Sequence, residues 1–456
     1  MVRLAGPDAV RIASSMLRLS RALEANRAHF GELIEPATGE RMDEVVATYF
    51  AKPHSYTTDD IVEISAHGAP VILRRVVDVA LSLGARLAEP GEFTMRAFLN
   101  GRLDLTQAEA VRDLIESQTL YQAKVAAQQL EGALSHRIAP IKQNLVELIA
   151  VLEAGVDFAE DDVSVMPNEQ ILVRIDHVRA PIAQLESSFA YGKIVHQGLT
   201  LAIVGRPNVG KSSLFNRLVE RERAIVTATP GTTRDLVTET VSIGGIPVEL
   251  VDTAGIRRAY DEAESIGIQK SREALADADL VLLVLDATQR PEPEDEDLLH
   301  AIENRPALVV ENKADLAAAS RRAAQDGSPR REPWENTNSN AEPQRGDRGI
   351  VEITPVRTSA LTGHGIPELR AAILAHIGGN GAQRESGFLT NIRQQNLVRD
   401  SLSALDAATS AVHTRVPHEM LLLDLYNALR PLDEITGATT SDDILGLIFS
   451  TFCIGK

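Results

Sequence analysis

The segment that most constrains this chain is a glycine-rich run, GRPNVGKS, at residues 205–212. It fits the phosphate-binding pattern G-x-x-x-x-G-K-[ST] and lies between an apolar, strand-like run at 199–204 and a helical pattern at 213–218. In such a unit, backbone N–H groups turn inward around phosphate oxygens, Lys211 bridges the β- and γ-phosphates, and the Ser212 hydroxyl ligates Mg²⁺. The run therefore predicts a P-loop nucleotide-binding domain.

The base is indicated by Asn312, Lys313 and Asp315, an N-K-x-D motif that follows the apolar run 307–310. The Asp315 carboxylate can accept from both N–H groups of a guanine edge. Adenine lacks that pair of donors and would leave a buried carboxylate unpaired, which is costly. We expect Asn312 and the stem of Lys313 to hold the ring, and backbone N–H groups of Ser359 and Ala360 to close the base pocket. The motif predicts GTP as the nucleotide.

Two further motifs stand in the order expected of a GTPase: GTTRD at 231–235, and DTAG at 252–255 after a strand-like run at 248–251. The DTAG aspartate would hold the Mg²⁺ shell, its glycine N–H would sense the γ-phosphate, and a GTTRD threonine would supply a second Mg²⁺ ligand. The residues expected to contact GTP are Asn208, Val209, Gly210, Lys211, Ser212, Ser213, Thr227, Ala228, Thr229, Pro230, Gly231, Thr232, Thr233, Asp252, Thr253, Ala254, Gly255, Asn312, Lys313, Asp315, Ser359 and Ala360.

The residue that orients the attacking water is less evident. Many small GTPases place a glutamine directly after DTAG, but this chain has Ile256, which cannot orient water. The following acidic loop offers Asp261, Glu262 and Glu264, and chemistry alone does not choose among them or exclude a solvated surface. The amide oxygen of Asn208 can coordinate a monovalent cation beside the phosphates, and such an ion can act in place of an arginine finger.

Composition bounds the remaining interpretation. A chain of 456 residues has room for two or three domains, and an aromatic content of 4% predicts aliphatic, helix-rich cores. The single cysteine, Cys453, excludes an intramolecular disulfide, and no apolar run approaches the roughly 18 residues of a membrane span. We therefore expect a cytoplasmic protein without a membrane partner. The net charge of −18 argues against a general nucleic-acid coat but leaves room for a local basic patch.

Residues 1–102 predict a compact α+β domain. The expected helices span 16–30 and 71–83, and the expected strands span 45–50 and 61–65. The N-terminus carries four arginines and few acidic residues, which faintly resembles a transit peptide; these are Arg3, Arg11, Arg18 and Arg21. We favour an amphipathic surface helix instead.

Helical patterns flank the nucleotide motifs on both sides. Residues 104–191 are typical of long amphipathic helices, with Thr106 as the expected N-cap of the first, and helices are expected again at 392–413 and 419–429. These patterns predict a multidomain α/β protein in which a Ras-like P-loop GTPase domain is inserted into a helical domain. The expected boundaries are 198–378 for the GTPase domain and 103–197 with 379–456 for the two parts of the helical domain.

Residues 317–349 interrupt the GTPase pattern with polar turn formers and almost no aliphatic side chains. We expect a disordered surface insertion that leaves both guanine-reading loops intact. A solvated loop is favoured over a nucleic-acid contact for its basic cluster, which comprises Arg321, Arg322, Arg330 and Arg331.

Motifs outside the nucleotide site give a family resemblance. The chain carries PGEFT at 90–94 with RAFLN at 96–100, LDLTQAEA at 103–110, ITG at 435–437 with DDIL at 442–445, and a terminal FCIGK at 452–456. Together with GTTRD and a GTPase domain embedded in helices, these motifs closely resemble the tRNA modification GTPase MnmE (TrmE) family. The resemblance covers nearly the whole length, and the FCIGK ending is its most specific element.

The resemblance implies a cytosolic, potassium-stimulated GTPase that works with the flavoprotein MnmG, which carries FAD, as a heterotetramer. Together they would modify C5 of the wobble uridine of certain tRNAs, adding an aminomethyl or carboxymethylaminomethyl group. A tetrahydrofolate derivative, 5,10-methylene or 5-formyl, would supply the carbon, and glycine or ammonium the amine. The family forms homodimers through a folate-binding-like N-terminal domain, and its GTPase domains associate when K⁺ and GTP are bound.

The resemblance also assigns residues by position. Glu264 matches the glutamate that orients the attacking water through a second water, which implies that it acts in preference to its acidic neighbours. Ser212 and Thr233 match the Mg²⁺ ligands. Cys453 is open to a covalent role in the uridine chemistry or a role in positioning the tail. The K⁺ positions are Asn208, Thr227, Thr229 and Thr232, and the folate positions are Arg3, Glu63, Arg102, which stands where a lysine occurs in the family, and Lys456.

The chain departs from the family at its start, where Met1 stands in place of a preceding strand and a Gly-rich turn. We therefore expect an exposed sheet edge, and the completeness of the folate pocket stays open. Two alternatives remain. One is a GTPase switch in ribosome assembly without carbon transfer, which the single GTPase domain and the FCIGK tail disfavour. The other is a truncated GTPase that cannot carry the carbon unit.

Overall fold

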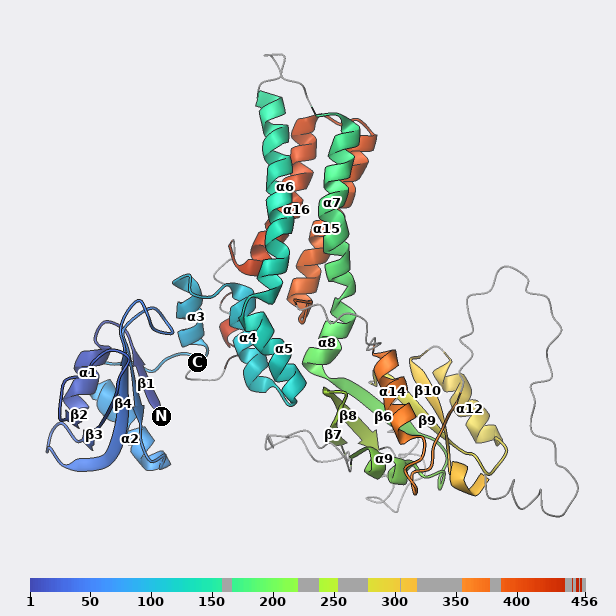
Figure 1. Cartoon of the computed structure of the whole chain (residues 1–456), viewed down its shortest axis with the longest axis horizontal. Coiled ribbons are helices and arrows are strands. Elements are labelled where there is room, and N and C mark those ends of the chain that lie inside the picture. Colours follow the sequence, from blue (N-terminus) through green and yellow to red (C-terminus); the bar gives the residue numbers. More distant parts are fainter. Residues whose placement is uncertain are drawn as a thin grey trace, which may run out of the picture. The chain divides into compact units, whose positions relative to one another are not determined.

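The computed structural model divides into two compact units (Figure 1). The first comprises Met1–Glu116, Val125–Ser188 and Ser386–Lys456, and the second comprises Ser117–Lys124 and Phe189–Glu385. The structure describes residues 1–157, 166–219, 238–252, 278–303, 305–317, 355–377, 387–438, 445, 448–450 and 452, without the side chains of Asp157, Thr238 and Asp252. A mixed sheet, an antiparallel sheet and long helices confirm the expected multidomain α/β class.

The N-terminal part of the first unit is an antiparallel sheet with the strand order β1-β5-β4-β3-β2. Helices α1 (Ala9–Met16) and α2 (Pro70–Ser82) supply Ile12, Met16 and Val76 to a core with Leu33 and Ile64 of the sheet. The strands are β1 (Val2–Ala5), β2 (Leu17–Leu19), β3 (Ala28–Ile34), β4 (Arg41–Phe50) and β5 (Ile61–Ser65). The expected strands at 45–50 and 61–65 are thereby confirmed, as is the helix at 71–83 apart from its last residue.

The helix expected over residues 16–30 is wrong. Helix α1 ends at Met16, and the chain continues directly into β2, where Leu17 pairs with Leu33. The alternation of buried Leu17 and exposed Arg18 suits a strand that buries one face, so pairing with β3 overrides the helical spacing. The N-terminal arginines do not share one amphipathic helix either, because β1, α1 and β2 divide them.

Four long helices run alongside one another in the first unit: α6 (Ala133–Asp157), α7 (Asn168–Ser187), α15 (Ile392–His413) and α16 (His418–Thr436) (Figure 1). The helix expected at 392–413 is confirmed, and the one expected at 419–429 is part of the longer α16. Their shared core is aliphatic, as the composition predicts; its members include Leu145, Leu148, Leu152, Ile171, Ile175, Leu405 and Leu425. The preceding shorter helices are α3 (Glu92–Leu99), α4 (Leu105–Glu116) and α5 (Leu120–Leu130).

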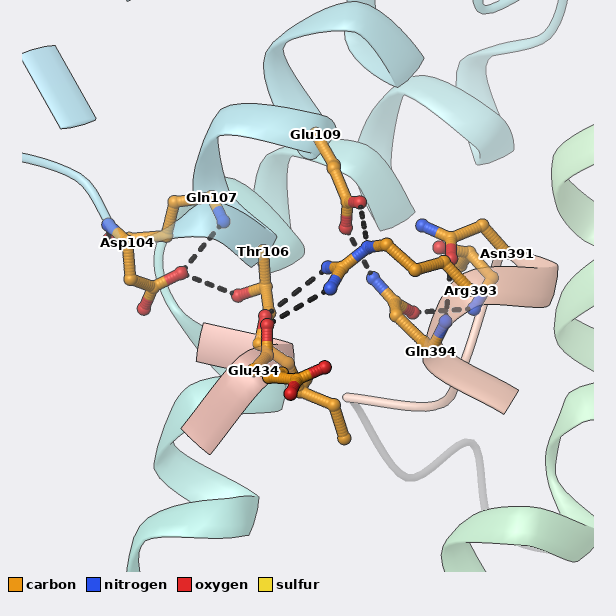
Figure 2. Close-up of polar contacts among 10 residues, drawn as sticks. Asp104, Thr106, Gln107, Glu109, Asn391, Arg393, Gln394 and Glu434 are labelled. Carbon is orange, nitrogen blue, oxygen red and sulfur yellow. Dashed lines mark hydrogen bonds and ion pairs between the residues drawn. The ribbon is translucent and has the colours of Figure 1, made fainter. Parts of the chain in front are cut away.

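Asp104, and not Thr106, caps the start of α4. The Asp104 carboxylate accepts from the backbone N–H of Gln107 at 2.9 Å, and the Gln107 side chain accepts from the backbone N–H of Asp104 at 2.9 Å (Figure 2). This reciprocal pair is a capping box. Thr106 lies two residues further on, in the first turn, and its hydroxyl donates to Asp104 at 2.7 Å. The expected cap is therefore wrong by two residues, because an aspartate at 104 satisfies the first free N–H groups.

A largely enclosed ion pair joins the two sequence-distant parts of the helical bundle. Arg393, in the first turn of α15, donates from Nε to Glu109 of α4 at 2.8 Å and from Nη1 and Nη2 to the carbonyl oxygens of Glu434 and Ile435 (Figure 2). Gln394 donates to the other carboxylate oxygen of Glu109 at 2.8 Å. Arg393 thus neutralises a carboxylate that is 11% exposed and satisfies carbonyls at the end of α16.

We expect Arg393→Met to lower the free energy of unfolding of the helical bundle by about 3 kcal/mol, because it leaves the Glu109 carboxylate buried without its cation. The matched control is Arg399→Met on the same helix, since Arg399 pairs with Glu186 at a largely exposed site. That control should cost less than about 1 kcal/mol. Denaturant unfolding followed by the far-UV signal measures both, and equal losses would contradict a special role for Arg393.

The second unit is built on a mixed sheet with the strand order β11-β10-β9-β6-β8-β7. All neighbours are parallel except the β7–β8 hairpin. Helices α8 (Phe189–Gln197), α9 (Lys211–Val219), α12 (Pro293–Ile302) and α14 (Ile366–His376) accompany it. Its strands are β6 (Leu199–Val204), β7 (Thr238–Ile243), β8 (Ile246–Asp252), β9 (Leu280–Asp286), β10 (Ala307–Asn312) and β11 (Val356–Arg357).

The parallel strands bring the phosphate loop after β6, Asp252, Asp286 and the N-K-x-D motif to one edge of this sheet. Ile203 lies in register with Asp252, and Asn312 lies in register with Asp286. Ligand sites in such sheets lie at the carboxyl ends of the strands, so this edge is where a nucleotide site is expected. None of the helices in the described part of the chain is both long and apolar enough to cross a bilayer.

Candidate GTP-binding site

The phosphate-binding loop connects β6 to α9 and depends on close backbone approaches. A Cβ at Gly205 would lie 2.3 Å from the carbonyl oxygen of Val284, and a Cβ at Gly210 would lie 2.3 Å from Nδ2 of Asn312. Both glycines have positive φ, at +148° and +97°. Any side chain at either position would collide with the neighbouring strand ends, so these glycines allow the loop to sit tightly against β9 and β10.

Lys211, the first residue of α9, is folded back onto its own loop. Its Nζ donates to the carbonyl oxygens of Gly205 at 2.8 Å and Arg206 at 2.7 Å. Ser212 and Ser213 follow in the first turn of α9, half-buried and exposed respectively. The helix N-terminus and the ammonium group therefore lie together at the loop, which is the arrangement that binds phosphate.

Asn312 joins the phosphate loop to the base-reading loops. It is 2% exposed, and its Nδ2 donates to the carbonyl oxygen of Val209 at 3.0 Å. Its Oδ1 accepts from the backbone N–H of Ala360 at 3.0 Å and from the Thr358 hydroxyl at 3.4 Å. Three segments that are separate in the sequence thus meet at one amide side chain.

Asp286 is a residue of this site that the sequence analysis missed. It ends β9, is 8% exposed, and accepts from Lys313 Nζ at 2.7 Å and from the Thr288 hydroxyl at 2.6 Å. Burial alone would raise the pKa of Asp286, but the hydrogen bonds from Lys313 and Thr288 outweigh it and hold the pKa below its usual range. The sequence signal was a polar D-A-T run directly after the apolar residues 280–285, at the same strand end as the other motifs.

The base-reading side chains lie around Asn312. Lys313 has φ +63°, and the half-buried Asp315 carboxylate has no hydrogen-bond partner within the described residues. Ser359 and Ala360 lie beside Asn312, but their N–H groups already have protein acceptors, His364 O at 2.9 Å and Asn312 Oδ1 at 3.0 Å. In this structure the two N–H groups therefore hold the loop rather than point at a base.

Several expected contacts lie outside the described residues. The backbone of Asp252 ends β8 beside the phosphate loop, but its side chain lies outside the described part of the structure. Asn208 is described: it is exposed, has φ +62°, and its amide has no partner within the described residues. The expected residues beyond the described ranges are Thr227, Ala228, Thr229, Pro230, Gly231, Thr232, Thr233, Thr253, Ala254, Gly255, Glu264, Cys453, Lys456 and most of the 317–349 insertion.

A second cluster gathers in the first unit around Tyr56. Arg3 pairs with Glu63 on the neighbouring strand at 2.6 Å, and its guanidinium lies 5.9 Å from the Tyr56 ring centroid. The guanidinium of Arg102 lies 5.6 Å from the same ring and hydrogen-bonds the carbonyl of Ser55. The structure thus brings together three of the four expected folate positions, and Tyr56 is an aromatic member that the sequence analysis missed. The cluster offers cations beside a ring, a donor set suited to a flat anionic ligand.

The C-terminal segment is anchored near α3 and α4. Phe449 and Phe452 are buried in a cluster with Leu105 and Ala108, and their ring centroids lie 5.4 Å apart. Gly91 precedes α3 with φ +67°, and a Cβ there would lie 2.7 Å from the carbonyl oxygen of Phe449. The family motifs PGEFT, LDLTQAEA and FCIGK therefore meet through described members of each.

Comparison with known proteins agrees with this geometry. The family model described as the GTP-binding protein TrmE N-terminus matches residues 1–102, and the MnmE helical domain model matches residues 105–453. The tRNA modification GTPase MnmE of Koribacter versatilis is 66% identical over 460 residues, covering 100% of this chain and 96% of the relative. The MnmE of Aquifex aeolicus is 42% identical over 457 residues, with the same coverage of both chains. This chain belongs to the MnmE family of tRNA modification GTPases.

For a member of the MnmE family, the contacts of Asp286 lead to a pH prediction. Because its pKa is lower in the folded chain, the carboxylate stabilises the fold fully above its unfolded pKa of about 3.9 and loses that effect as the pH falls through the lower folded value. We expect Asp286→Asn to lower the unfolding free energy by about 2 kcal/mol at pH 7. The difference from the parent chain should shrink below about pH 4.

Denaturant unfolding of the full chain between pH 7 and pH 3.5 measures this difference, with Asp297→Asn on the exposed side of α12 as the control. A difference between Asp286→Asn and the parent that stays constant over the whole pH range would contradict the ion pair as its cause.

Proposed function

We propose that this chain is a potassium-stimulated GTP hydrolase that, with the flavoprotein MnmG, modifies C5 of the wobble uridine of certain tRNAs. The observation that carries the GTPase part is the buried Asn312, which ties the phosphate loop to the guanine-reading N-K-x-D loop. Membership of the MnmE family over the whole length supports the tRNA modification. In this proposal the added group is aminomethyl or carboxymethylaminomethyl, and FAD is bound by the partner.

The donor groups of the site fit the ions that the family implies. The Ser212 hydroxyl at the start of α9 is a hard oxygen ligand suited to Mg²⁺, and Thr233 is its proposed companion. The exposed Asn208 amide oxygen is available for K⁺, with Thr227, Thr229 and Thr232 completing the proposed site. These ions would supply positive charge to the transferring phosphoryl group. Lys211 binds phosphate, and Glu264 is proposed to orient water through a second water.

The Tyr56 cluster is the proposed site of the tetrahydrofolate carbon donor. Arg3 and Arg102 would hold carboxylates of the ligand, and Glu63 would accept from its ring nitrogens. Lys456, and Cys453 in a covalent or positioning role, would approach with the anchored tail. Homodimerisation through residues 1–102, a heterotetramer with MnmG, a cytoplasmic location and the domain boundaries at 102, 197 and 378 are parts of the same proposal.

The alternative is a GTPase switch in ribosome assembly, and the cation dependence of turnover separates the two. We expect GTP turnover to be at least about tenfold faster in K⁺ than in Na⁺ at matched ionic strength, because an ion at Asn208 replaces an arginine finger. Asn208→Ala should lose most of this stimulation while the Kd for GDP changes little. Equal rates in the two salts would shift weight to the switch function.

Folate binding tests the carbon-transfer part separately. Equilibrium dialysis with 5-formyl-tetrahydrofolate should show binding to the full chain, and Arg102→Met should weaken it by about tenfold because a charge-assisted contact is lost. Arg74→Met on the exposed side of α2 is the control. GTP turnover should stay unchanged in both variants. If the parent chain hydrolyses GTP but binds no folate, it is a GTPase that cannot carry the carbon unit.

A further inference from the structure

The side chain of Arg206 leaves the phosphate loop and is held by the first turn of α12. It is 11% exposed, its Nε lies 2.8 Å from Oδ2 of Asp295, and Nη1 pairs with Glu292. Nη2 reaches Oε1 of Gln289 at 3.5 Å. The two carboxylates enclose the guanidinium. They thereby attach the second residue of the phosphate loop to the start of α12, which lies far along the chain.

The first turn of α12 is built to present these carboxylates. Glu292 is the N-cap, Pro293 opens the helix, and Asp295 closes a capping box by accepting from the backbone N–H of Glu292 at 3.0 Å. Asp295 is 2% exposed, and its Oδ1 has no hydrogen-bond partner within the described residues. The Nε contact lacks the alignment of a hydrogen bond, so Arg206 acts on Asp295 chiefly by charge. Without Arg206, a buried carboxylate would lose its nearest cation.

The backbone of Arg206 gives this attachment a link to the nucleotide. Its carbonyl oxygen accepts from Lys211 Nζ at 2.7 Å, together with the carbonyl of Gly205. Lys211 must leave both carbonyls to reach nucleotide phosphates. The loop is then held by contacts with residues outside it. Asn312 holds the second half through the carbonyl of Val209, and Asp295 holds the first half through the side chain of Arg206.

We propose that Arg206 and Asp295 form a positioning pair for the phosphate loop. The pair holds the first half of the loop in its anion-binding shape while Lys211 moves to the phosphates. Preorganisation of this kind increases the affinity for every nucleotide that places phosphates in the loop. Neither residue touches the reacting atoms, so the pair affects binding rather than the chemical step. The inference rests on the proposed GTPase function and names two residues that serve it.

The test uses the full chain with Mg²⁺ and K⁺ and compares Arg206→Met and Asp295→Asn with the parent. The probes are fluorescent derivatives of GTP and GDP, and GTP turnover gives kcat and KM. Each variant should raise both Kd values and KM by about tenfold, which is about 1.4 kcal/mol. The kcat should stay within about twofold, because binding of ground state and transition state weakens equally. Controls are the exposed Arg290→Met and Asp297→Asn, which should match the parent.

A double variant, Arg206→Met with Asp295→Asn, should bind no more weakly than the weaker single variant, because both changes remove one contact. Arg206→Lys keeps the charge and should restore part of the affinity even if Arg206→Met fails to fold. If the losses of affinity in the double variant are additive, or if only kcat falls, the proposal of a positioning pair is overturned. Parent-like affinity in every variant would also overturn it while leaving the proposed function intact. A parent chain that binds no GTP would instead remove the proposed function itself.

Discussion

The nucleotide site depends on one buried amide. Asn312 contacts the phosphate loop through its nitrogen and the loop after β11 through its oxygen, so both ends of the amide are used within the protein. An amide is suited to this because it carries a donor and an acceptor on one rigid plane. The close approach of Gly210 to the same nitrogen shows why a glycine stands there. One side chain therefore connects the phosphate loop to the N-K-x-D segment and to the loop after β11.

In both units, charged side chains form ion pairs at the ends of helices or strands. Each pair connects two elements that are far apart in the sequence. Arg393 meets Glu109 and the last carbonyls of α16, Lys313 meets Asp286 at a strand end, and Arg206 meets the first turn of α12. Each pair is largely enclosed, so its loss leaves an uncompensated charge. Such contacts help to fix how the end of one helix or strand is positioned against its neighbour. Aliphatic packing is less specific about that position than a charged contact with a defined partner.

The sequence predicts the parts of the fold that depend on local pattern. The strands 199–204 and 61–65 and the helix 392–413 have the predicted bounds, because apolar periodicity and turn residues mark them. The helix predicted over 16–30 fails where strand pairing overrides helical spacing.

The candidate site follows the same division. The phosphate loop and N-K-x-D motif are recognisable because their chemistry needs fixed residue types at fixed spacing. Asp286, Asp295 and Tyr56 were missed because their partners lie far along the chain, and only the fold shows which carboxylate or ring meets which cation.

The ion pair between Glu109 and Arg393 spans 284 positions of the chain, and the whole GTPase domain lies between its members. On the ribosome, α4 and α7 therefore emerge long before α15, which supplies the cation for Glu109 and packs against α7. The described strands of the inserted domain, β6 to β11, lie in one continuous stretch of the chain, so this domain can fold during that interval. The helical bundle can therefore be completed only after the GTPase domain has been synthesised, and until then the apolar face of α7 lacks α15 and that of α6 lacks α16.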